Sequence, residues 1–142
     1  MPDLPDLRDF VRAEPIPGRA TLLVRGGPDS AAKLETHAER VRRAFVLDGA
    51  SVLGISVFAA LDDIGPASLD EILAGKLPTY RVVHLVAAGR LIEAGFGVLP
   101  TFGRPHVTLR LHDLDQVKVL LELLGPAQAN PRYGGMRRRR RG

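Results

Sequence analysis

The stretch from Pro105 to His112 alternates apolar and polar residues, and this alternation constrains the fold more than any other segment. Its apolar members are Val107, Leu109 and Leu111. Its polar members carry imidazole, hydroxyl or guanidinium groups, and they are His106, Thr108, Arg110 and His112. Because successive side chains of a strand point to opposite faces, the pattern predicts a β-strand with one buried and one polar face. Such donors are the ones that phosphate binding and phosphate chemistry use.

Composition places the chain among ordinary globular proteins. Its 142 residues allow one domain with one core, and 45% hydrophobic and 25% charged residues are typical values. The absence of cysteine excludes disulfides and cysteine-based metal sites. No apolar run approaches the ~20 residues of a membrane span, and an acidic N-terminus is unlike a signal peptide. We therefore expect a cytoplasmic protein with no membrane contact.

The formal net charge of +4 is unevenly distributed along the chain. Residues 1–75 carry 8 basic and 12 acidic residues, whereas residues 76–112 carry 5 and 1. The C-terminus adds five consecutive arginines, which are Arg137, Arg138, Arg139, Arg140 and Arg141. Such a run can anchor a protein on nucleic acid or an acidic partner without sequence specificity. Two other interpretations stay open: a general bias toward arginine, which outnumbers lysine 17 to 3, and neutralisation by the acidic N-terminus.

Periodicity and turn residues divide the chain into alternating elements. Strands are predicted over residues 20–25, 51–60, 79–86, 96–99 and 106–112, and helices over 30–47, 68–74, 87–94 and 113–124. This order predicts an α+β fold, with a small mixed β-sheet of about five strands and helices packed on it. The expected organisation is an N-terminal arm over residues 1–19, an α+β domain over 20–125, and a disordered Arg-rich tail over 126–142.

The last predicted helix, residues 113–124, has more apolar surface than one contact requires. Its apolar residues are Leu114, Val117, Val119, Leu120, Leu121, Leu123 and Leu124. A surface of this width is consistent with a homodimer or a protein partner, and equally with a fully buried helix.

An alternative fold is suggested by the middle of the chain. The sequence "ALDDIGPASLDEI" followed by "LIEAGFGVL" resembles that of winged helix-turn-helix regulators. The resemblance implies a recognition helix over residues 77–95 and a hairpin wing over 96–111. The resemblance implies DNA binding, with the turn from Pro100 to Pro105 as the wing tip. The chain departs from that family at His84, where the recognition helix has an apolar residue.

A second resemblance is confined to a short motif. His106-Val107-Thr108-Leu109, preceded by Arg104-Pro105, resembles one half of the two-histidine phosphoesterases. That family uses two His-x-Thr/Ser motifs, one histidine acting as general base and the other as general acid. Only His106 and Thr108 match here, because neither His37 nor His84 is followed by the second motif.

The leading functional hypothesis is a small protein that engages nucleic acid or a nucleotide, in the manner of a toxin-like RNA-acting enzyme. In this hypothesis His106 is the acid or base and Thr108 orients it. The basic residues expected to hold phosphate, in addition to the tail, are Arg25, Arg81, Arg104 and Arg110. Two alternatives remain: a solvated face of an antiparallel sheet, and a non-catalytic interaction domain that docks through its arginine tail.

Other motifs are incomplete. Gly26-Gly27-Pro28 lacks the sequence motif of a phosphate-binding loop and predicts a turn before a helix. Asp62 and Asp63 have no third ligand at a fixed spacing, so we expect no metal and no cofactor. Ser56 lacks the second glycine of a nucleophile elbow.

Overall fold

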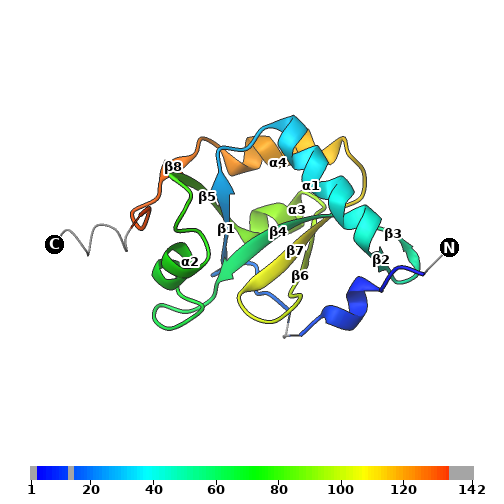
Figure 1. Ribbon diagram of the computed structural model, residues 1–142, viewed down its shortest axis with the longest axis horizontal. Coiled ribbons are helices and arrows are strands. Elements are labelled where there is room, and N and C mark those ends of the chain that lie inside the picture. The colour runs from blue at the N-terminus through cyan, green and yellow to red at the C-terminus, as the bar shows by residue number, and fades with distance from the viewer. Residues whose placement is uncertain (1–2, 13–14, 135–142) are drawn as a thin grey trace.

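A six-stranded sheet in the order β6-β7-β4-β1-β5-β8 forms the centre of the computed structural model (Figure 1). Its strands are β1 (Leu22–Gly27), β4 (Leu53–Ala60), β5 (Val82–Ala87), β6 (Gly97–Leu99), β7 (His106–Leu111) and β8 (Gln128–Ala129). The structure describes residues 3–12 and 15–134. The predicted tail arginines, Arg137–Arg141, lie outside the described residues.

The predicted α+β fold is confirmed. Four α-helices accompany the sheet, and they are α1 (Ala31–Ala44), α2 (Leu69–Gly75), α3 (Ala88–Glu93) and α4 (Gln116–Leu124). Strand directions, which we expected to be mixed, are antiparallel at every neighbouring pair of the sheet. The hairpin of β6 and β7 matches the predicted pairing of residues 96–99 with 106–112.

The two faces of the sheet differ in composition. One face carries the largest hydrophobic cluster, which includes Leu23, Ile55 and Leu109 and is covered by α3, α4 and part of α1. The apolar members of the 105–112 pattern are 1% exposed and belong to this cluster, as the alternation predicts. The opposite face carries two smaller apolar clusters, one under α2 that includes Val24 and one that includes Leu7 and Val52. The rest of that face has polar residues, and the candidate site lies there.

The helix predicted over residues 30–47 ends earlier than expected because its last residues form a hairpin. β2 (Val46–Leu47) pairs with β3 (Ala50–Ser51) across a turn made by Asp48 and Gly49, whose φ angles are 51° and 82°. Two consecutive residues with positive φ match the twist of a two-residue hairpin, and Asp-Gly is a favoured pair there. Asp48-Gly49 therefore closes a hairpin instead of ending a helix.

The N-terminal segment, expected to be an arm, belongs to the fold. The 3₁₀-helix η1 (Leu7–Phe10) buries Leu7 in a third cluster with Leu47 and Val52. The Asp6 carboxylate accepts the backbone N–H groups of Asp48 and Gly49, each at 3.0 Å. This segment therefore holds the β2–β3 turn in place.

The C-terminal segment up to residue 134, expected to begin a disordered tail, also packs on the domain. β8 adds to the edge of β5, and the buried Asn130 amide donates to the backbone oxygens of Leu77 and Tyr80 at 2.8 and 2.9 Å. Arg132 forms an ion pair with Asp70 of α2 at 2.9 Å. The domain boundary predicted at residue 125 is therefore too early.

The winged-helix alternative is wrong. The expected recognition helix, residues 77–95, contains β5, which lies between β1 and β8 in the sheet. On α4, Val117, Leu120 and Leu124 are buried in the main cluster, so much of the apolar surface of that helix is used inside the domain. Among residues 3–12 and 15–134, no helix is long and apolar enough to cross a membrane.

Candidate functional site

A cavity of about 660 Å³ opens on the polar face of the sheet, between α1 and the segment that follows α2. α1 forms one wall, and β4 with the end of β1 forms the floor. The opposite wall consists of Lys76, Leu77 and Tyr80. The remaining lining residues are Arg25, Gly26, Lys33, His37, Arg40, Val41, Ala44, Phe45, Ser56 and Phe58.

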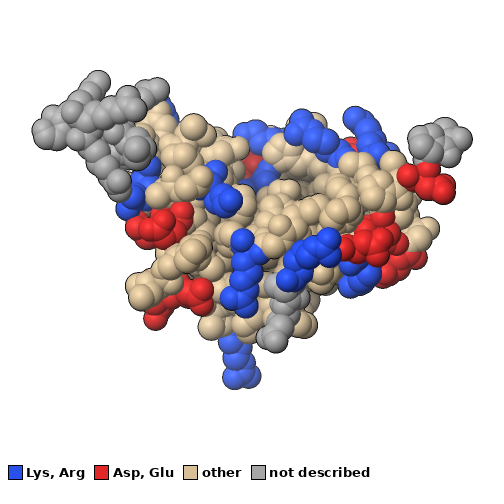
Figure 2. All heavy atoms as spheres, turned by 60° about the horizontal axis from the view of Figure 1, so that its bottom comes forward, with Lys and Arg blue, Asp and Glu red and all other residues tan. Residues whose placement is uncertain are grey.

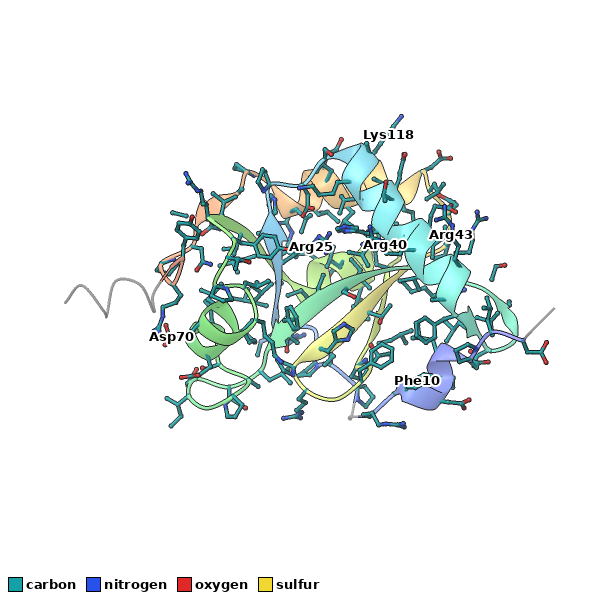
Figure 3. All side chains as sticks on the ribbon, in the orientation of Figure 1. Phe10, Arg25, Arg40, Arg43, Asp70 and Lys118 are labelled. Carbon is teal, nitrogen blue, oxygen red and sulfur yellow. The ribbon has the colours of Figure 1, made fainter. Side chains whose placement is uncertain are left out.

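The charged groups of this cavity are all cationic. Arg25, Lys33, Arg40 and Lys76 line it, and no aspartate or glutamate of the described residues does. Figure 3 shows Arg25 and Arg40 side by side beneath α1, coming from β1 and from the helix. In the space-filling view of Figure 2, basic side chains spread over the middle of the visible face and acidic ones gather toward its two ends. Among the described residues, no carboxylate therefore lines the cavity that an anion would enter.

Arg25 fills the position where two strands separate. The β1–β4 ladder runs only to the Val24–Phe58 pair, and beyond it the Arg25 Nη1 donates to the Ser56 carbonyl at 2.8 Å. Its Nε donates to Asp29 Oδ2 at 3.0 Å, and the Asp29 side chain is fully buried. The guanidinium thus donates a hydrogen bond to a carbonyl that has no backbone partner in the strand ladder. It also neutralises a buried carboxylate.

His37 completes the α1 side of the cavity. Its Nδ1 accepts from the Arg25 guanidinium, which has only donors, so the proton of the neutral ring is on Nε2. Burial lowers the pKa of His37 below 6.5, and the nearby charges of Arg25 and Arg40 lower it further. The ring is therefore neutral at neutral pH and carries an N–H donor.

Three aromatic side chains, Phe45, Phe58 and Tyr80, give the cavity apolar surface among its cations. Tyr80 lies so close to β1 that a Cβ added at Gly26 would stand 2.5 Å from its ring. A Cβ at Gly27 would similarly meet the ring of His84 at 2.6 Å. The Gly-Gly pair, predicted to form a turn, instead belongs to β1 and allows two rings to approach the strand.

His106 and Thr108 lie on the polar face, as the alternation predicts, but they do not share one environment. Thr108 is 3% exposed, and its hydroxyl bonds that of Thr101 at 2.7 Å. The half-buried His106 ring lies between the rings of Phe58 and Phe102, with its Nδ1 3.2 Å from the Thr101 carbonyl. Its Nε2 lies 3.3 Å from Ser56 Oγ. Burial lowers the pKa of His106 below 6.5, despite the bond to Thr101.

The other predicted basic residues do not gather at this site. Arg81 is exposed and stacks on Tyr133, with its guanidinium 5.5 Å from the ring centroid. Arg104 is exposed in the turn before β7. Arg110 lies on β7, which β4 separates from β1, and its side chain packs over Gly97. Of the four arginines expected to hold phosphate in addition to the tail, only Arg25 lines the cavity.

Several lining residues were not identified from the sequence. Lys33, His37 and Arg40 follow one another at helical spacing on α1, so they share one side of the helix. This basic stripe on one side of the helix could have been recognised from the sequence. No comparable signal marks Ser56, Lys76 or Tyr80, because their proximity arises only when α1 and the segment after α2 face each other across the sheet.

His84 is buried beside this site. It is 3% exposed, and its Nε2 accepts the backbone N–H of Asp29 at 3.4 Å. Among the residues that the structure describes, no three histidine, cysteine or acidic side chains come together as metal ligands. No known protein family, curated protein or solved structure matches this chain.

Proposed function

We propose that the protein binds a ligand of the nucleotide class, either free or at the end of an RNA chain, in the cavity beneath α1. One observation carries the proposal: a cavity lined by four cationic side chains and by no acidic residue of the described chain. Those of the four that form no ion pair with a described residue, Lys33, Arg40 and Lys76, repel one another, and an anionic ligand removes that cost.

The charge balance favours a phosphate group. Arg25 is already neutralised by Asp29, but Lys33, Arg40 and Lys76 form no ion pair within the described part of the chain. A phosphate monoester carries about −1.5 to −2 charges at neutral pH and accepts several charge-assisted hydrogen bonds. The three remaining cations match that charge better than they match a carboxylate.

The aromatic side chains favour a ring beside the phosphate. Phe45, Phe58 and Tyr80 line the same cavity as the cations, and stacking of a base on such rings contributes about 1–3 kcal/mol. The volume of about 660 Å³ lies within the range of roughly 300–1,000 Å³ that small-molecule sites occupy. Phosphate-binding cations next to stacking surfaces are the combination that a nucleotide requires.

Calorimetric titration with AMP, ATP and adenosine tests this proposal. We expect both nucleotides to bind and adenosine to bind more weakly. Arg40→Ala removes one charge-assisted contact, and we expect about a tenfold loss of AMP affinity. Arg43→Ala is the matched control, because Arg43 lies on the same helix and does not line the cavity. Equal affinities for AMP and adenosine, or equal losses in the two variants, would contradict the proposal.

A further inference from the structure

Ser56, which lines the cavity, and His106 on the neighbouring strand bring a hydroxyl and an imidazole together. Ser56 is exposed and lines the cavity from β4, and its Oγ lies 3.3 Å from the Nε2 of His106 on β7. The two residues are diagonal neighbours in the sheet, since Ser56 pairs with Thr108 and His106 with Phe58. Their separation is therefore set by strand register and not by a loop.

The third group of this arrangement is Thr101, which has two oxygens near His106 Nδ1: its backbone carbonyl at 3.2 Å and its hydroxyl at 3.1 Å. The carbonyl can only accept a hydrogen bond, and the hydroxyl accepts from the ring when it donates its own proton to Thr108 Oγ1, 2.7 Å away. In that arrangement a neutral His106 carries its proton on Nδ1 and presents the lone pair of Nε2 to the Ser56 hydroxyl. Thr101 is itself fixed, since it is fully buried and its hydroxyl bonds that of Thr108. A nucleophile, a base and a group that orients the base define an activated serine.

The surroundings suit chemistry on phosphorus. The Arg25 guanidinium donates to the backbone carbonyl of Ser56 at 2.8 Å, so it holds the strand at the residue that carries the hydroxyl. Burial and the charge of Lys76 both lower the pKa of His106, so the ring is neutral at neutral pH, as a general base must be. The cations of the cavity can stabilise the charge on the oxygens of a transferring phosphoryl group.

We propose that Ser56 is the nucleophile and His106 its general base in the cleavage of a phosphoester bond. The substrate class, a phosphoester of a nucleotide, rests on the function proposed above. Ser56 Oγ attacks phosphorus while its proton passes to His106 Nε2, and the bond from phosphorus to the leaving oxygen breaks. That oxygen takes the proton from His106. Water then attacks the phosphorus of the phosphoserine while His106 takes its proton. The bond from phosphorus to Ser56 Oγ breaks and Oγ takes that proton from His106, which releases phosphate and restores the serine.

Reaction with a fluorophosphonate probe tests the pair without requiring the natural substrate. Attack by Ser56 forms an O–P bond and releases fluoride, so intact-mass spectrometry reports the adduct and peptide mapping locates it. We expect labelling of the full chain at Ser56, its loss in Ser56→Ala, and a rate roughly 100-fold lower in His106→Gln. Ser51→Ala, a control at another exposed serine, should react like the wild type.

The outcomes separate this inference from the proposed function. Wild-type protein that binds AMP but gains no adduct overturns the serine–histidine proposal and leaves nucleotide binding intact. An adduct at Ser56 without AMP binding overturns the nucleotide assignment alone. Labelling that persists in Ser56→Ala, or an unchanged rate in His106→Gln, also overturns the proposed pair.

Discussion

Two histidines at the candidate site, His37 on α1 and His106 on β7, have the same ring and opposite proton positions. The Nδ1 of His37 accepts from a guanidinium, so its proton is on Nε2. The Nδ1 of His106 faces the carbonyl of Thr101 at 3.2 Å and its hydroxyl at 3.1 Å, so its proton is on Nδ1 when that hydroxyl donates to Thr108. One ring thus offers a donor, whereas the other offers a lone pair to a hydroxyl. The difference teaches that the partner of one ring nitrogen determines what the other can do.

The two regions also differ in how they are held. His37 depends on a buried ion pair, because Arg25 is fixed by the enclosed carboxylate of Asp29. His106 depends on neutral hydrogen bonds and on the flanking rings of Phe58 and Phe102. Changes at the ion pair should therefore affect the α1 region strongly and the β7 region little.

The largest expected effect follows from Arg25→Leu. This substitution leaves the buried Asp29 carboxylate without its cation and the Ser56 carbonyl without a donor. We expect the free energy of unfolding to fall by about 3–5 kcal/mol, as for other broken buried pairs. Urea denaturation measures the change.

The double variant Arg25→Leu/Asp29→Asn is the control for this effect. It removes the stranded charge as well, so we expect it to recover part of the lost stability. If the single variant were as stable as the wild type, Arg25 would not be what holds the two strands at this point.

A smaller effect should appear in the pH dependence of stability. Both His37 and His106 have folded-state pKa values below the ordinary 6.5, so below that pH the unfolded chain binds more protons. The free energy of unfolding should be constant just above pH 6.5 and should fall as the pH drops toward the two folded-state pKa values. Denaturation at a series of pH values tests this, with His37→Gln/His106→Gln expected to flatten the slope. A slope unchanged in that variant would assign it to other groups.

The smallest effect is spectroscopic. In ¹⁵N-labelled protein, the imidazole shifts should report His37 protonated at Nε2 and His106 protonated at Nδ1. Arg25→Leu removes the guanidinium from one ring only, so the His37 signals should move and those of His106 should stay. The same tautomer at both rings would remove the basis for their different roles.

The sequence was sufficient to predict the structure where interactions between residues close together in the chain determine it. The alternation of Val107, Leu109 and Leu111 with polar residues predicts a half-buried strand, because strand geometry alone sets which face each side chain takes. The position of His106 on the polar face of the sheet was predicted in this way. The fold class followed for the same reason, from the local periods of its helices and strands.

The sequence was not sufficient to predict the structure where segments that are far apart in the chain come into contact. The acidic and proline content of the first residues predicts an extended arm. Leu7 is nevertheless buried, because it packs against the hairpin at residues 46–51. Ser56 lacks an elbow motif, and its hydroxyl lies 3.3 Å from the His106 ring only because β4 and β7 are adjacent in a register that no local pattern specifies. The cavity depends on how α1 crosses the sheet.

The contact between Tyr80 and Gly26 also bears on how such a site can change over evolution. The Tyr80 ring occupies the space that the Cβ of any other residue at position 26 would need. A single-base change from glycine to alanine would displace the ring and move one wall of the cavity, with no other residue altered. Ligand preference at this site is therefore open to a one-step mutation on the strand, away from the cations that would hold the phosphate.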